Sequence, residues 1–86
     1  MNISKLEQRV LHALARGGRI HHWRDQRGRI TDVRCFTHEG SVLADCTPEL
    51  FARLRRRRLI ASSQGAPYRI TKRGIESVRP LPDNRS

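Results

Sequence analysis

The stretch Thr47-Pro48-Glu49-Leu50-Phe51-Ala52-Arg53-Leu54-Arg55-Arg56-Arg57-Arg58-Leu59-Ile60, residues 47–60, decides the fold. Threonine is a favoured N-cap, proline fits the first helical position, and Glu49 complements the positive end of the helix dipole. These signals predict a helix over about 48–57. Leu50, Phe51 and Leu54 share one face of it, so this face is expected to pack on the core.

The same stretch carries the densest positive charge of the chain, because five of the six residues at 53–58 are arginine. On a phosphate backbone, each neutralised contact releases a counterion. Arginines at a helix C-terminus also complement the dipole and keep a protein soluble, but five exceed what a cap requires. The same side chains can instead grip acidic groups on a protein, and charge alone does not separate the two partners. The predicted binding residues, with three cations from the segment that follows, are Arg53, Arg55, Arg56, Arg57, Arg58, Arg69, Lys72 and Arg73.

A second helix start lies near the N-terminus, where Ser4-Lys5-Leu6-Glu7 has the pattern of a capping box. Leu6, Val10 and Leu14 recur every four residues with Leu11 beside them, so they are expected to form the core face of a helix. Gly17-Gly18 tolerates positive φ, and the helix is predicted over about 5–16.

Between and after these helices the chain has strand-like character. Residues 19–46 predict a three-stranded meander with turns at 25–28 and 38–41, although the alternation in Ile30–Phe36 does not show which face packs inward. Runs at 59–63 and 68–71 predict a hairpin, and 71–78 a short last helix with Ile75 and Val78 docking back. The prediction is one α+β domain over 1–78 and a flexible tail over 79–86.

Composition sets the scale of what this domain can do. The chain has 86 residues, a formal charge of +10 and a hydrophobic share of 36%. One modest core fits these values, and a large enzyme with a deep two-domain cleft is excluded. Sixteen of its 18 cationic residues are arginine, which predicts an acidic partner. With no long apolar run, the chain is expected to be soluble and cytoplasmic, without a membrane partner.

The residues that could carry catalysis or bind a metal are few and scattered. Cys35 and Cys46 are expected to be reduced, half-buried small hydrophobes, and their spacing with the histidines lacks the two close ligand pairs of a zinc site. The histidines could serve a metal-independent ribonuclease, but no spacing singles out a base, an acid and an orienting group. Trp23 is expected in the core, so a platform for stacking unpaired bases has weak support. The histidines are His12, His21, His22 and His38.

Two resemblances bear on fold and function. An arginine-rich helix followed by a hairpin resembles the recognition helix and wing of winged-helix DNA-binding domains, although three strands stand where a further helix is usual. The chain as a whole resembles the YjhX family of small basic bacterial proteins. The matching stretches are Glu7-Gln8-Arg9, Gly17-Gly18-Arg19-Ile20, Leu43-Ala44-Asp45-Cys46-Thr47, Pro67-Tyr68-Arg69-Ile70 and Pro82-Asp83-Asn84-Arg85.

The second resemblance implies a toxin that inhibits DNA topoisomerase I by direct binding and is opposed by an antitoxin protein. It supplies no catalytic residues, so the leading expectation is a non-enzymatic, winged-helix-like protein without cofactors. The arginines would either grip the enzyme or occupy its DNA. The alternatives are a winged-helix transcriptional regulator or nonspecific nucleic-acid-binding protein, and a ribonuclease toxin.

Overall fold

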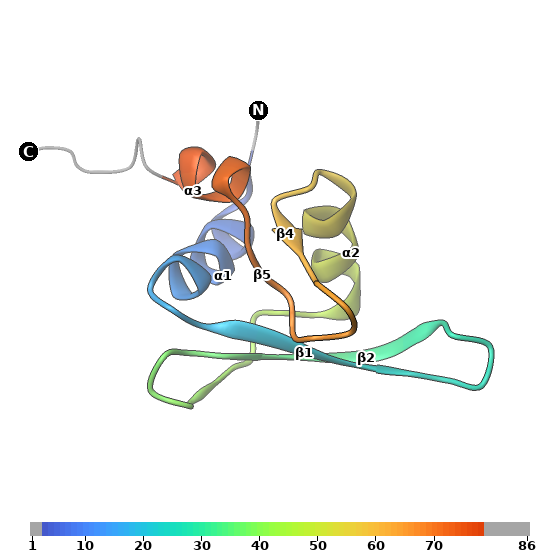
Figure 1. The fold of residues 1–86 in the computed structure, drawn as a ribbon. Coiled ribbons are helices and arrows are strands. Elements are labelled where there is room, and N and C mark those ends of the chain that lie inside the picture. Colours follow the sequence, from blue (N-terminus) through green and yellow to red (C-terminus); the bar gives the residue numbers. More distant parts are fainter. Residues whose placement is uncertain (1–2, 79–86) are drawn as a thin grey trace, which may run out of the picture.

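The computed structural model describes residues 3–78, a mixed α/β domain of three helices, a three-stranded antiparallel sheet and a two-stranded hairpin (Figure 1). The tail predicted over 79–86 lies outside the described residues. In chain order the elements are α1 (Lys5–Ala15), β1 (Arg19–Arg24), β2 (Ile30–Phe36), β3 (Val42–Leu43), α2 (Pro48–Arg56), β4 (Ile60–Ala61), β5 (Arg69–Ile70) and α3 (Lys72–Val78). The predicted order is confirmed, with hairpin strands shorter than expected.

The helix starts follow the local signals of the sequence. The Ser4 hydroxyl accepts a hydrogen bond from the Glu7 amide at 3.1 Å, and the Glu7 carboxylate accepts one from the Ser4 amide at 2.9 Å. This is the predicted capping box. At the start of α2, the Thr47 hydroxyl accepts a hydrogen bond from the Leu50 amide at 3.2 Å. Both caps satisfy amides that lack partners within the helix.

Both long helices end in the same way, with one residue at positive φ. Gly17 has φ 107° after α1, and Arg58 has φ 62° after α2. After α2, the Arg58 amide donates to the Arg55 carbonyl and the Leu59 amide to the Leu54 carbonyl, each at 3.0 Å. This is the Schellman geometry, in which glycine is the usual residue at positive φ. Arginine takes that place after α2.

The register of the sheet shows which side of each strand faces the core. Ile20 lies opposite Cys35 and His22 opposite Val33. Val33 and Cys35 are buried, so this parity of β2 packs inward. The sequence alone did not establish that choice.

All three helices lie on this inner side of the sheet, and no element of residues 3–78 covers its other side, which we call the bare side (Figure 1). Tyr68, just before β5, exchanges two backbone hydrogen bonds with Ile20 of β1, which attaches the hairpin to the sheet. The buried apolar side chains form one core, made of Val10, Leu11, Leu14, Ile20, Val33, Cys35, Cys46, Leu50, Phe51, Leu54, Leu59, Ile60, Tyr68 and Val78.

Three expectations about the core are wrong. Leu6 is 48% exposed, because Glu7 takes the inward position on the first turn of α1. Ile75 is 43% exposed, and only Val78 of the predicted pair docks onto the core. Trp23 is 47% exposed, because its parity on β1 faces the bare side of the sheet. Each error concerns which side of a correctly predicted element is covered.

Candidate binding surfaces

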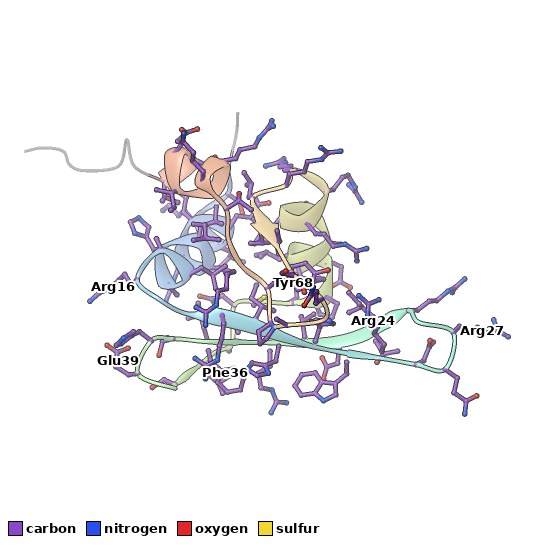
Figure 2. The ribbon with its side chains drawn as sticks, in the orientation of Figure 1. Arg16, Arg24, Arg27, Phe36, Glu39 and Tyr68 are labelled. Atoms are coloured by element: carbon purple, nitrogen blue, oxygen red, sulfur yellow. The ribbon has the colours of Figure 1, made fainter. Side chains whose placement is uncertain are left out.

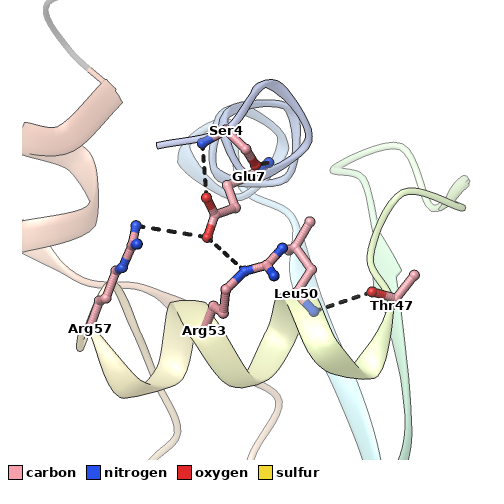
Figure 3. A network of polar contacts seen from close by, with 6 residues as sticks. All are labelled: Ser4, Glu7, Thr47, Leu50, Arg53 and Arg57. Carbon is pink, nitrogen blue, oxygen red and sulfur yellow. Dashed lines mark hydrogen bonds and ion pairs between the residues drawn. The ribbon is translucent and has the colours of Figure 1, made fainter. Parts of the chain in front are cut away.

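Two arginines of the predicted binding set are held by an acid on another helix. The Glu7 carboxylate lies 3.5 Å from Arg53 Nε and 3.8 Å from Arg57 Nη1, and it connects α1 to α2 (Figure 3). Its side chain is only 4% exposed, whereas those of Arg53 and Arg57 are 49% and 36% exposed. Arg53 and Arg57 therefore fix the position of α2 against α1, in addition to any binding role.

The surroundings of Glu7 keep it ionised. Burial would raise the pKa of this carboxyl, but the hydrogen bonds of Ser4 and the charges of Arg57 and Arg53 outweigh burial and lower the pKa. A carboxylate at this point also faces the positive end of the α1 dipole. The sequence revealed Glu7 as a capping residue, but not as the counterion of two arginines some fifty positions away.

The end of α2 meets the start of α3. The Thr71 hydroxyl donates to the Arg58 carbonyl at 2.8 Å, and the Thr71 amide donates to the Leu59 carbonyl at 3.0 Å. Lys72 and Arg73 follow Thr71 directly and are exposed, as is Arg58. We call Arg58, Lys72 and Arg73 the basic end. It unites three predicted residues separated by 13 positions of sequence.

Stability alone does not explain the residues of the basic end. Lys72 and Arg73 lie in the first turn of α3, which is the positive end of the helix dipole. This turn contains no acidic residue. Arg58 occupies a left-handed conformation that costs an ordinary L residue about 1 kcal/mol. Dipole complementation accounts for arginines within the last turn of α2, but not for these three cations.

Arg55 belongs to a different surface. With Arg24 and Arg29 it lines an open cleft of about 380 Å³ between α2 and the β1–β2 hairpin, where Phe51 and Ile30 add apolar surface. Arg24 is held in place, since its Nη1 donates to the Gly28 carbonyl at 2.6 Å. Three guanidinium groups around an apolar wall suit an anionic group joined to a planar or apolar body.

The remaining two predicted residues lie at the margins of these surfaces. Arg56 is exposed on the last turn of α2 and, with Arg55, borders a second shallow hollow. Arg69 is exposed on β5, opposite Ala61. The eight predicted residues therefore do not form one continuous patch: two hold Glu7, three form the basic end, and the others spread over α2 and β5.

The histidines are spread over separate places. His12 and His38 are exposed and line an open hollow of about 390 Å³ with Arg16 and Glu39, which lie at the same end of the sheet in Figure 2. His21 and His22 point to opposite faces of β1. Within residues 3–78, no three histidine, cysteine, aspartate or glutamate side chains lie together as a metal site would require.

His22 is the histidine most affected by its surroundings. It packs edge-on against Tyr68, with ring centroids 5.1 Å apart, and its buried Nδ1 has no hydrogen-bond partner. Burial lowers its pKa, and the positive charges of Arg24, His21 and Arg55 lower it further. The neutral imidazole is therefore favoured at pH 7.

The two cysteines are in contact. Cys35 and Cys46 are free thiols, both buried, and their side chains are hydrogen-bonded to each other. That hydrogen bond and burial raise the pKa of Cys46. The expectation of reduced cysteines is confirmed, and they are fully rather than half buried.

Comparison with known proteins identifies a family over nearly the whole chain. Residues 1–85 match the model of the family YjhX_toxin, described as "Putative toxin of bacterial toxin-antitoxin pair". Similar proteins include a UPF0386 protein of Beijerinckia indica, 60% identical over 99% of this chain and 100% of its own length. Others occur in Rhodospirillum centenum, 60% identical over the full length of both chains, and in Caulobacter vibrioides, 55% identical over 99% of this chain and 93% of its own. No solved structure matches the chain.

One further finding concerns membranes. No helix within the part of the chain that the structure describes is long and apolar enough to cross a bilayer.

Proposed function

We propose that this chain, which belongs to the YjhX toxin family, acts without catalysis by binding DNA topoisomerase I through its basic end. The toxin family implies an antitoxin partner. The choice of topoisomerase I follows from the family resemblance, and the choice of surface follows from the side chains. The other predicted residues lie outside the basic end and add to the positive field of the whole protein; they are Arg53, Arg55, Arg56, Arg57 and Arg69.

The observation that carries the choice of surface is the placement of three cations where stability favours other residues. Glycine is favoured at Arg58, and acids or small polar residues are favoured at Lys72 and Arg73. Natural proteins keep such unfavourable choices mainly at functional sites. The geometry that follows Arg58 also resembles a winged helix, since α2 leads directly into the β4–β5 hairpin.

A relaxation assay with supercoiled plasmid and purified topoisomerase I tests this function. The chain should inhibit relaxation. The double variant Lys72→Ser with Arg73→Ser should need at least about tenfold more protein for the same inhibition, as expected for central interface cations. Lys5→Ser with Arg16→Ser removes the same charge from the exposed arc of α1 and serves as the matched control, with less than about twofold effect. Absence of inhibition at any ratio of the two proteins would refute the function.

A second experiment separates the two mechanisms. If the arginines grip the enzyme, topoisomerase I should remain bound to the immobilised chain after nuclease treatment. If the chain instead occupies DNA, nuclease should release the enzyme. We propose direct contact between this chain and topoisomerase I, and loss of the enzyme on nuclease treatment would overturn it.

The cleft supports one alternative function. Arg24, Arg29 and Arg55 flank the outer side of α2, where a winged-helix recognition helix would meet duplex DNA. A regulator of this type binds duplexes with an affinity that falls steeply with salt. Charge reversal at Arg55 and Arg56 should then abolish duplex binding, whereas failure to shift any duplex at low salt excludes this alternative.

A further inference from the structure

The bare side of the sheet carries a row of planar side chains. Directly opposite residues on antiparallel strands point to the same side. The pairs Arg19–Phe36, His21–Arg34 and Trp23–Asp32 therefore all project from the side opposite the buried pairs. Figure 2 shows Phe36 on that side, away from the helices and from Tyr68.

These side chains contact one another as a ladder of rings and guanidinium groups. Arg34 lies over the Trp23 ring at 6.0 Å, and Arg19 lies over the Phe36 ring at 5.7 Å. His21 meets the edge of Phe36, with centroids 5.1 Å apart, and its Nε2 accepts a hydrogen bond from Arg19 Nε at 3.2 Å. The contacts hold the rings in position before any ligand arrives. We call Arg19, His21, Trp23, Arg34 and Phe36 the planar ladder.

Core packing does not account for the planar ladder. The helices cover the other face, and Trp23 is 47% exposed. A tryptophan leaves a large apolar area in water at this position, and large exposed apolar groups on a sheet commonly mark a binding surface. Aromatic rings interleaved with arginines are the side chains that bind single-stranded nucleic acid, in which bases stack on rings and phosphates meet cations.

We propose that the planar ladder binds single-stranded DNA. The net charge of +10 attracts a polyanion, and the guanidinium groups of Arg19 and Arg34, which lie over the rings, can receive phosphates. A duplex keeps its bases stacked internally and cannot offer them to Trp23 or Phe36. Trp23 lies opposite Asp32, and Phe36 four residues further along β2, which is about 13 Å of strand. The two rings can therefore stack separate bases of one strand.

The face offers little for recognition of ribose. His21 Nε2 already accepts from Arg19, and Asp32 Oδ1 accepts from the Val33 amide at 2.8 Å. The second Asp32 oxygen can still accept from a 2′-hydroxyl, but the remaining members of the planar ladder are rings and guanidinium donors, which do not require one. A deoxyribose strand therefore satisfies the surface, and no preference for RNA is expected.

Trp23 is the only tryptophan of the chain, so its fluorescence reports directly on this face. Titration with a twelve-nucleotide oligothymidylate should quench the emission, whereas a duplex of equal length should not. Trp23→Leu, measured by anisotropy of a labelled oligonucleotide, should lose at least about fivefold in affinity, the lower limit for one stacked base. Trp23→Phe retains a ring and should stay within about threefold of the original affinity.

Val42→Ala is the matched control. Val42 lies opposite Phe36 on the same face and is 56% exposed, but it has no ring to stack on a base. Its affinity should change by less than about twofold. Arg34→Gln should reduce the dependence of log affinity on log salt by about 0.7, the value for one phosphate contact on a single strand.

Three results would overturn the proposal: no quenching by the oligonucleotide, equal affinity of Trp23→Leu and the original chain, or binding of RNA without DNA. Circular dichroism confirms that each variant folds. The proposal is independent of topoisomerase inhibition, which the variants of Lys72 and Arg73 test. Those variants should retain oligonucleotide quenching, so failure of one proposal is visible without failure of the other.

Discussion

Replacement of Glu7 tests the ion pairs that hold α1 against α2. Glu7→Ala removes both the capping box and the counterion of two arginines. Loss of a cap costs about 1 kcal/mol, and each ion pair with a partly exposed arginine contributes about 0.2–1 kcal/mol. The expected loss is about 1.5–3 kcal/mol. A domain of this size loses about 4–8 °C in Tm per kcal/mol, so thermal unfolding should shift by roughly 6–24 °C.

Glu7→Gln separates the two contributions. Glutamine at this position still completes a capping box, so only the ion pairs are lost, and the expected cost is about 1 kcal/mol. Urea unfolding followed by circular dichroism at pH 7 measures both variants. If Glu7→Gln is as stable as the original chain, the carboxylate does not hold Arg53 and Arg57, and the assignment of these arginines is wrong.

The difference in folding stability between the original chain and Glu7→Gln should depend on pH. Glu7 has a pKa below its ordinary value of 4.5 in the folded chain. A lowered folded pKa stabilises the fold above the unfolded pKa, and this stability is lost as the pH falls through the folded pKa. The original chain should therefore lose its advantage over Glu7→Gln progressively below about pH 4.5. The pKa of Glu39 is also lowered, but this side chain is fully exposed. Glu39→Gln therefore serves as the control, and it should lose stability below about pH 4.5 as the original chain does.

Three further predictions concern packing and backbone geometry, each measured by thermal unfolding. Arg58→Gly removes the cost of an arginine in the left-handed conformation, so the free energy of unfolding should rise by about 0.5–1 kcal/mol and Tm by a few degrees. A lower Tm would show that the arginine stabilises the turn. Gly18→Ala places a Cβ 2.5 Å from the Phe36 carbonyl oxygen and should cost about 1–3 kcal/mol, whereas an unchanged Tm would show that β2 moves freely. Leu11→Ala should cost about 2–5 kcal/mol because Leu11 is fully buried, whereas Leu6→Ala should cost less than about 1 kcal/mol because Leu6 is half exposed. Equal effects would contradict the inward position of Glu7.

The elements of this fold were predictable because their signals are local. Ser4 with Glu7, and Thr47 with Pro48, determine helix starts through hydrogen bonds and steric constraints within four residues. Glycine-containing turns mark the ends of the strands in the same way. Such signals do not depend on what the element later packs against, and the predicted boundaries agree with the structure to within one or two residues for every helix.

The side of an element that is covered depends on distant residues, and there the prediction failed. Tryptophan is usually a core residue, but the three described helices pack on the other face of β1, so Trp23 is exposed. The inward parity of β2 could not be predicted because neither parity is wholly apolar: one includes Ile30 and Phe36 with two charged residues, and the other includes Thr31. The basic end could not be predicted as a unit either, because the Arg58 carbonyl meets Thr71 only after the hairpin closes.

The exposed positive charge of this chain follows from how it uses its acids. Several acidic side chains are engaged by backbone amides: Glu7 receives the Ser4 amide, Asp25 the amides of Arg27 and Arg29, and Asp32 that of Val33. An acid committed to a cap or a turn is held at one place in the fold, so it neutralises only the arginines that pack beside it, as Glu7 does for Arg53 and Arg57. The excess of ten positive charges is thereby exposed in part on the basic end and the planar ladder. Backbone demands on the few acids, and not the arginine count alone, determine where an acidic partner can bind.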